Sequence, residues 1–315
     1  SFAEVAHCYN YTKPEISETT DLTIKNGRHP LIERIIPENQ FIANDTQLNS
    51  TDDQIMIITG PNMAGKSTYL RQVSLITLMA QVGSFIPADS AHISIVDRIF
   101  SRVGAQDHLQ KGMSTFMVEM NETANILNNA TEKSLIILDE IGRGTSTFDG
   151  ISIAWSIVEY LHGDSAGGPK TLFATHYHEL TDLALVLKGV KNFNVQVKEW
   201  NDEIIFLRKI ISGGADKSYG IQVARLAGLP EKVLHRAREV LFNLEKSEFD
   251  DMGAPKIAHS GEESIEPKAE QLGLFLETAH PAIKQLETIE PDNLSPRQAM
   301  ETLYLLKNLI KNTSK

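Results

Sequence analysis

The 315-residue chain contains a single cysteine, Cys8. One cysteine cannot form an internal disulfide and excludes a CxxC metal site, which fits a reducing compartment. No stretch approaches the roughly 18 to 20 consecutive apolar residues of a membrane span, and the first residues lack the basic-then-apolar pattern of a signal peptide. We therefore expect a cytoplasmic protein with no membrane partner.

Basic residues are outnumbered, with 30 Lys and Arg against 41 Asp and Glu and a formal net charge of −11. Contacts with nucleic-acid phosphates need clustered Lys and Arg, so this charge argues against the chain being a main DNA-binding surface. Hydrophobic residues make up 41% of the chain and charged residues 23%, which is a globular balance. The length allows one large α/β domain with smaller elements.

A phosphate-binding loop is the first motif that carries chemistry. Ile55–Thr59 is an apolar run typical of a buried strand, and a helix is predicted from Ser67 onward. The turn between them would aim backbone N–H groups and a helix N-terminus at one point, where a polyphosphate can bind. Lys66 would neutralise the β- and γ-phosphates and Ser67 would ligate Mg²⁺, whereas the alternative is a glycine-containing turn without a ligand. The candidate nucleotide-binding residues are Gly60, Pro61, Asn62, Met63, Ala64, Gly65, Lys66, Ser67 and Thr68.

Two carboxylates follow the apolar run at residues 135–138. Asp139 and Glu140 come directly after it, as carboxylates do where a central parallel strand ends beside a phosphate site. Asp139 would hold Mg²⁺ through water, and Glu140 would orient or deprotonate the attacking water. An Asp-Glu pair alone also simply ends strands at solvated turns, so this assignment depends on the phosphate loop.

A histidine follows the third predicted strand, at residues 171–175. Here His176 could hydrogen-bond the γ-phosphate and report its presence, although a lone histidine at a strand end more often has a structural role. The carboxyl ends of parallel strands meet at one edge of a sheet. We therefore expect the phosphate loop, the carboxylates and His176 to converge.

Four motifs carry a family resemblance: LDEIGRGTSTFDG at 138–150, KGMSTFMVEM at 111–120, GRHP at 27–30 and DKSYGIQVARLAGLP at 216–230. Together they closely resemble the bacterial branch of the MutS family of DNA mismatch-repair ATPases, over nearly the whole chain. The resemblance implies an ABC-type P-loop ATPase that uses ATP and Mg²⁺ to control mismatch recognition and the sliding-clamp state on DNA. It also implies a fragment, because mismatched double-stranded DNA is bound by upstream domains. Ala64 stands where the family often has Gly, which matters only if φ must be positive.

The resemblance implies a dimer in which each nucleotide lies between the phosphate loop of one subunit and a signature segment of the other. Ser114, at the start of a predicted helix over 114–128, would reach the partner's γ-phosphate, and a helix N-terminus suits that anion. Ser114 or Thr115 is also a good N-cap, and the two roles are compatible. Residues 142–150 would form a loop across the dimer interface. Phe41 would stack on adenine, although a core or surface aromatic also explains it.

The expected architecture is an α/β fold with a mostly parallel sheet covered by helices. We expect a strand at 22–24, a hairpin from runs at 195–200 and 203–207, and helices at 218–227 and 231–244. In the family the helical pair embraces the neighbouring subunit. We divide the chain into the end of a core domain (1–53), the ATPase domain (54–215), a helical dimerisation element (216–246), a disordered linker with a clamp-binding-like peptide (247–276) and a C-terminal helical oligomerisation module (277–315).

The C-terminal region adds two interaction motifs. The peptide QLGLF, from Gln271 to Phe275, resembles the peptide with which bacterial replication proteins bind the sliding clamp, and a frayed amphipathic turn is the alternative. Residues 295–310 form a short amphipathic helix that is too small to bury its apolar stripe alone. Asp292 and Arg297 match positions that pair between subunits in the family. The implied partners are a second copy in a homodimer, further copies in a tetramer, the sliding clamp and a MutL-type protein.

Other functions fit the residues less well. An ABC transporter subunit would carry LSGGQ where this chain has GMST, and a GTPase would carry an NKxD motif. A MutS paralogue acting on recombination intermediates would end in a nuclease tail, for which residues 277–315 are too few. The alternative from another class is an interaction or tethering module that hydrolyses ATP weakly on its own.

Overall fold

The computed structural model describes residues 1–37, 40–61, 64–103, 114–163, 167–200, 203–214 and 219–245. The chain divides into two units, Ser1–Ile257 and Ala258–Lys315, and every described residue belongs to the first. The predicted linker, the clamp-binding-like peptide and the C-terminal helical module lie outside the described residues. Among the described helices, none combines the length and apolarity that crossing a membrane requires.

A six-stranded sheet forms the centre of the described part of the chain, in the order β10-β9-β4-β8-β7-β6. All neighbouring strands are parallel except β9 and β10, which form the predicted antiparallel hairpin. The mostly parallel α/β sheet is therefore confirmed. The strands are β4 Ile55–Thr59, β6 Ile99–Arg102, β7 Leu135–Asp139, β8 Lys170–Ala174, β9 Val190–Trp200 and β10 Glu203–Ser212.

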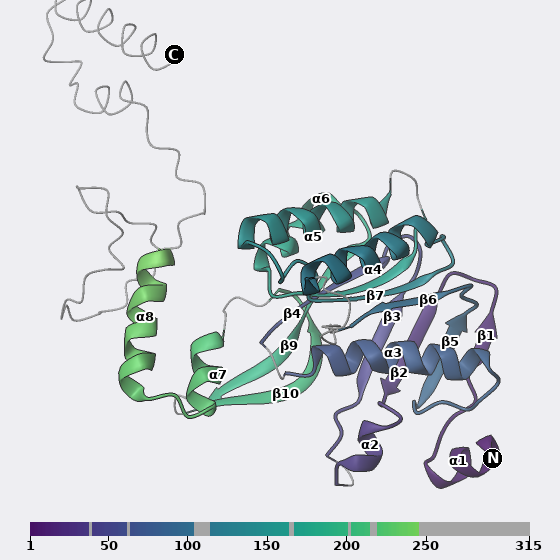
Figure 1. Cartoon of the computed structure of the whole chain (residues 1–315). Helices are drawn as coiled ribbons and strands as arrows, with labels where there is room; N and C mark the ends of the chain where they lie inside the picture. Colours follow the sequence, from purple (N-terminus) through teal and green to yellow (C-terminus); the bar gives the residue numbers. More distant parts are fainter. Residues whose placement is uncertain are drawn as a thin grey trace, which may run out of the picture. The chain divides into compact units, whose positions relative to one another are not determined.

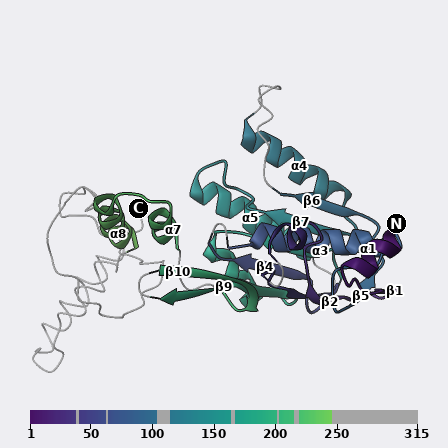
Figure 2. The ribbon, with the colours of Figure 1, turned by 90° about the horizontal axis from the view of Figure 1, so that it is seen from below.

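Helices cover both faces of this sheet (Figure 1; Figure 2). On one face lies α3 (Lys66–Gln81), and on the other lie α4 (Thr115–Asn129), α5 (Thr147–His162), the 3₁₀ helix η2 (His178–Asp182) and α6 (Leu183–Val186). The alternation of side chains along each strand divides the core accordingly. In β7, Leu135 and Ile137 belong to the cluster around α3, and Ile136 and Leu138 to the cluster around α5.

A second sheet, in the order β1-β5-β2-β3, packs on the α3 side. Its strands are β1 Glu15–Ser17, β2 Leu22–Gly27, β3 Asn44–Leu48 and β5 Ser90–Ser94, with α1 (Phe2–Cys8) and α2 (Ile32–Ile35) nearby in the sequence. Leu22, Ile24 and Leu48 are buried in the same core cluster as α3. Residues 1–53 thus share a hydrophobic core with the sheet that follows them.

The helical pair after the hairpin has nearly the predicted bounds, with α7 at Gly220–Leu226 and α8 at Glu231–Glu245. The two helices contact each other, and Leu234 of α8 is buried. Strand β9 begins earlier than predicted, because Val190 pairs in parallel with Ile55 of β4. Strand β10 carries a bulge between Phe206 and Ile210, which the run of apolar residues did not predict.

Candidate functional site

The three predicted strand ends lie side by side. Ala174, the last residue of β8, pairs with Ile58 of β4 on one side and with Asp139 of β7 on the other. The phosphate loop leaves β4 at this edge, and His176 follows two residues after Ala174. The predicted strand 171–175 is displaced by one residue, since β8 ends at Ala174 and the Thr175 hydroxyl instead accepts the Tyr177 N–H at 3.0 Å.

The phosphate loop has the backbone that its glycines permit. Gly60 has a φ of +134° and Gly65, the N-cap of α3, has a φ of +109°, both in a region that favours glycine. Ala64 is fully buried and its φ is not positive, so alanine is compatible with this position. Asn62 and Met63 lie outside the described residues.

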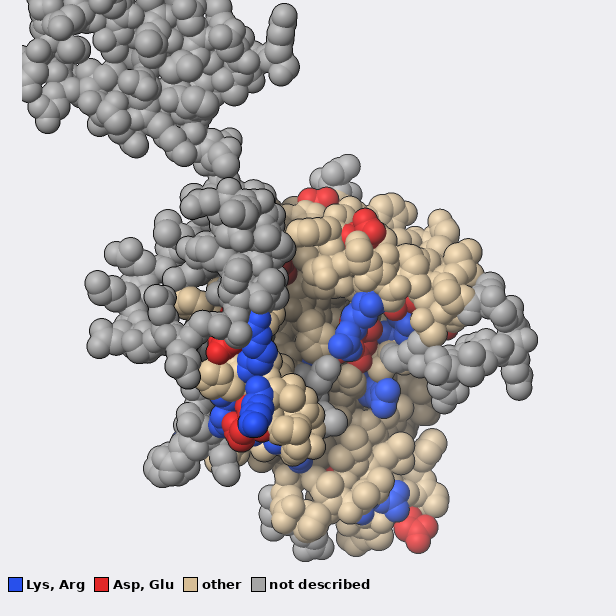
Figure 3. All heavy atoms as spheres, turned by 60° about the vertical axis from the view of Figure 1, so that its left-hand side comes forward, with Lys and Arg blue, Asp and Glu red and all other residues tan. Residues whose placement is uncertain are grey.

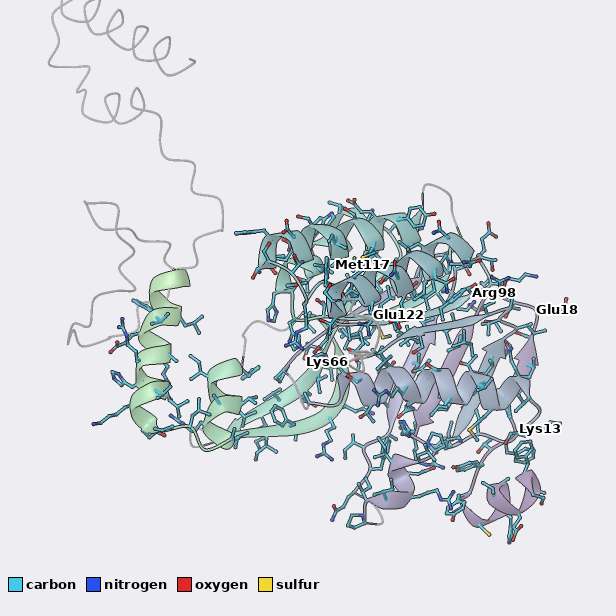
Figure 4. All side chains as sticks on the ribbon, viewed as in Figure 1. Lys13, Glu18, Lys66, Arg98, Met117 and Glu122 are labelled. Atoms are coloured by element: carbon cyan, nitrogen blue, oxygen red, sulfur yellow. The ribbon has the colours of Figure 1, made fainter. Side chains whose placement is uncertain are left out.

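Lys66 lies at the start of α3 (Figure 4), and its side chain bonds back to the loop that precedes the helix. Its Nζ donates to the carbonyl oxygens of Gly60 at 2.5 Å and of Pro61 at 3.1 Å. Burial lowers the pKa of Lys66 to about 8, although the nearby carboxylates of Glu140 and Asp139 act to raise it. The ammonium group is therefore buried next to two carboxylates and held by backbone oxygens.

The surroundings of Asp139 suit a metal ligand. It is 7% exposed, and burial raises its pKa while a hydrogen bond from the Ser67 hydroxyl opposes the shift. Its Oδ1 has no hydrogen-bond partner within the described part of the chain. A buried carboxylate oxygen without a donor, beside a serine hydroxyl, fits the oxygen ligands that Mg²⁺ prefers. The residues present therefore fit the ion.

Glu140 is held by two partners. Its Oε1 pairs with Nε2 of His176, and its Oε2 pairs with Nη1 of Arg143. Burial acts to raise the pKa of Glu140, but the interactions with His176 and Arg143 outweigh burial and hold it at about 2. The backbone of Glu140 has a φ of +58°, which is strained for a residue with a side chain. The structure thus brings Glu140 and His176 together, and adds Arg143, which sequence reasoning missed.

Two cavities flank the start of α3. The first, of about 420 Å³, is lined by Ser67, Arg71, Asp139, Glu140 and Arg143 among others. The second, of about 200 Å³, is lined by Ile32, Ile36, Phe41, Thr68 and Arg208 among others. The first cavity is lined by charged side chains and the second by several aliphatic and aromatic ones, which suits the two ends of a nucleoside triphosphate.

Arg208, in the second cavity, was missed from the sequence. It lies in the bulge of β10 with a φ of +54°. The side-chain amide of Asn44 fixes the bulge, because its Nδ2 donates to the Arg208 carbonyl at 3.0 Å and its Oδ1 accepts from the Ile210 N–H at 2.8 Å. Phe41 is half-buried at the same cavity. Arg208 lines this cavity because of the bulge, which the sequence does not indicate.

The candidate residues for the neighbouring subunit lie at the start of α4 and α5. Ser114 is exposed and caps α4, accepting the Met117 N–H at 3.2 Å. The segment 142–150 is only partly a loop, since α5 begins at Thr147. Its glycines serve contacts within the chain, because a Cβ on Gly142 would lie 2.7 Å from the Gly150 carbonyl oxygen and one on Gly144 would lie 2.8 Å from Cβ of Phe116.

A phosphate loop before a helix, with a carboxylate pair two strands away on a mostly parallel sheet, is the arrangement of P-loop nucleoside triphosphatases. Fold and site therefore place the chain in this class. Residues 56–245 match the family profile of MutS domain V, an ABC-type P-loop ATPase, and the chain belongs to the MutS family. Residues 276–309 match the DNA mismatch repair protein MutS C-terminal region.

Curated relatives are similar along the whole chain. The DNA mismatch repair protein MutS of Thermodesulfovibrio yellowstonii is 59% identical over 99% of this chain, and that of Clostridium tetani is 52% identical over 100%. The chain spans 35% and 37% of the length of these two relatives. It corresponds to their ATPase region, domain V, and to their C-terminal region.

Proposed function

We propose that the chain hydrolyses ATP to ADP and phosphate with Mg²⁺ in two composite sites of a homodimer, and so controls a mismatch-repair clamp. The observation that supports this most directly is the meeting of Lys66, Asp139 and Glu140 at the carboxyl ends of neighbouring strands. In the proposed complex the amides of residues 60–65 bind the phosphates. Lys66 exchanges its two carbonyl partners for phosphate oxygens.

Ser67 and Asp139 would hold Mg²⁺, which supplies charge neutralisation for the phosphate oxygens when bound. The unpartnered Oδ1 of Asp139 supports this assignment. Glu140 would then orient the attacking water. With a pKa held at about 2, it is an ionised hydrogen-bond acceptor and a weak base, so orientation is the better description of its role.

His176 and Arg143 would change partners during the cycle. Both hold Glu140 in this structure, and both carry N–H donors that suit a γ-phosphate. A γ-phosphate that attracts either side chain frees one oxygen of Glu140 for water. The sensing role proposed for His176 follows from this competition.

The second cavity would take the base. Phe41 offers a ring to stack on adenine and Arg208 a planar cation at the same cavity. Asn44, the first residue of β3, fixes the bulge that contains Arg208 through two hydrogen bonds. Phe41 lies three residues before Asn44. The base therefore contacts parts of both sheets.

The dimer is proposed from the exposed N-terminus of α4. Ser114 caps α4 and is exposed, as a residue that contacts the nucleotide of another subunit must be. The helical pair α7 and α8 would contribute to the same dimer. The C-terminal region, residues 276–309, would add a further contact between copies.

DNA and protein partners are proposed for the longer protein. On the face shown in Figure 3, the described Lys and Arg side chains lie in small separate groups, several beside Asp or Glu. This distribution, with the net charge of −11, supports mismatched DNA being bound by other domains. Contacts with the sliding clamp through residues 271–275 and with a MutL-type protein are proposed from the family alone.

The test is the Glu140→Gln variant with the wild-type chain beside it. We expect calorimetry to show Mg²⁺-dependent ATP binding by both, and turnover to fall by at least roughly 100-fold in the variant. Wild-type turnover per chain should rise with protein concentration, because each site needs a second copy. A tethering module that hydrolyses ATP weakly on its own would show no rise in turnover per chain with protein concentration.

A further inference from the structure

A buried carboxylate outside the proposed reaction connects α4 to the loop that carries Glu140. Glu119 is 7% exposed, and its Oε1 accepts the backbone N–H of Gly142 at 2.6 Å. Its Oε2 accepts from Nη2 of Arg102 at 3.2 Å. A carboxylate that is buried with both oxygens occupied is a fixed element of the structure.

The partners of Glu119 are fixed as well. Arg102, the last residue of β6, is 4% exposed, and its Nε lies 2.9 Å from Oε2 of Glu122, one turn further along α4 (Figure 4). Glu122 is half-exposed and touches only Arg102 among these groups. Arg102 thereby keeps an ionic partner if Glu119 is changed, and Glu122 provides a matched control.

Gly142 stands two residues after Glu140 and is held from two sides. Its N–H binds Glu119, and its carbonyl oxygen accepts from the Tyr177 hydroxyl at 2.9 Å. With a φ of +93° and Gly150 against it, the peptide has little freedom to move. The position of Gly142 constrains the direction of the backbone after Glu140. Glu140 itself has a strained backbone, with a φ of +58°.

We propose that Glu119 is a positioning residue for ATP hydrolysis, which holds the segment after Glu140 against α4 through the Gly142 N–H. This inference rests on the proposed role of Glu140. The property of Glu119 that matters for this role is an oxygen that reaches the Gly142 N–H. Its negative charge matters less, because Arg102 also pairs with Glu122. The same contact ties Glu140 to the helix that begins after Ser114.

Three substitutions separate reach from charge. Glu119→Ala removes the acceptor, Glu119→Asp keeps the charge but withdraws it by one methylene, and Glu119→Gln keeps an oxygen at full reach without the charge. Glu122→Gln is the control. A displacement of about 1 Å at a catalytic group can lower turnover by roughly 100-fold. We therefore expect kcat to fall at least tenfold in the Ala and Asp variants and to stay within about threefold of wild type in the Gln and control variants.

Two further measurements make the result specific. Glu119 lines the cavity beside Asp139 and Glu140 but lies outside the phosphate loop, so the Kd for ATP should change by a smaller factor than kcat in the Ala and Asp variants. Hydrogen exchange of a peptide containing Gly142 should quicken in the Ala and Asp variants only. If the Ala variant does not fold, the Asp and Gln pair still decides the question.

Wild-type kcat in the Ala or Asp variant would overturn the proposal, as would an equal loss in the Gln and Asp variants. Failure of the wild-type chain to bind or hydrolyse ATP would instead refute the proposed function. In that case the exchange rate at Gly142 still reports whether Glu119 holds the loop.

Discussion

Replacing Lys66 by Met tests the site through folding stability. Lys66 is 4% exposed, and burial lowers its pKa from 10.5 to about 8. Because the folded chain binds this proton more weakly, the unfolded chain holds more protons between pH 8 and pH 10.5. The free energy of unfolding contributed by Lys66 therefore rises with pH across this window, and the residue destabilises the fold most below it.

The magnitude follows from the shift of 10.5 − 8 = 2.5 pH units. At about 1.4 kcal/mol per pH unit, the full penalty below pH 8 is about 3 kcal/mol. Between pH 8 and pH 10 the linkage relation gives a change of about 2 kcal/mol. In the Met variant this contribution is absent, while the two loop carbonyls lose their donor at every pH.

The assay is chemical unfolding of wild type and Lys66→Met at pH 8 and at pH 10, without nucleotide. Other titrating groups cancel in the comparison of the two chains, so the difference in unfolding free energy should move by about 2 kcal/mol in favour of wild type. Lys188→Met, at a lysine whose side chain is 88% exposed, is the control and should show no such movement. If the difference in unfolding free energy between the two chains stays constant with pH, or moves in favour of the variant, the lowered pKa of Lys66 is refuted.

Three other outcomes are expected. Phe41→Ala should weaken ATP binding by roughly tenfold while leaving tripolyphosphate binding unchanged, as measured by calorimetry; equal effects on both ligands would remove the ring from the base site. Gly142→Ala should lower the free energy of unfolding by about 1–3 kcal/mol, whereas Gly163→Ala, at a φ of +70° but with open space around it, should lose less. Deleting residues 271–275 should abolish capture of the chain by the sliding clamp, and undiminished capture would dismiss that peptide.

The strands that carry the phosphate loop and the two carboxylates were predictable because they are apolar runs. Ile55–Thr59 and Leu135–Asp139 are buried on both faces, and such runs bounded by glycine or acidic residues have few other structures available. Their functional ends could be predicted too, since parallel strands bring carboxyl ends to one edge. The resemblance to MutS, now confirmed by the match over residues 56–245, added the ABC-type class.

Of the second sheet, the strand expected at 22–24 is part of β2, and the other strands were not predictable from local pattern. Strand β5, Ser90–Ser94, contains one residue with a large aliphatic side chain, Ile93, and pairs with β1 and β2, which lie far earlier in the sequence. Arg208 and Glu119 were missed for the same reason. The role of Arg208 depends on a bulge, and that of Glu119 on a contact between distant segments. Neither feature can be predicted from the surrounding sequence.

The partners of Lys66 and Glu140 have a common physical meaning. Each charged group is bonded to groups of the chain itself: Lys66 to two carbonyl oxygens, and Glu140 to an arginine and a histidine. A nucleotide must therefore replace existing bonds, so the net binding free energy is smaller than the sum of its contacts. The groups it releases are the ones the reaction needs, since the γ-phosphate that draws Arg143 or His176 away also exposes a Glu140 oxygen. Removing Arg143 should on this argument raise the pKa of Glu140 toward its ordinary value, because a lowering partner is lost.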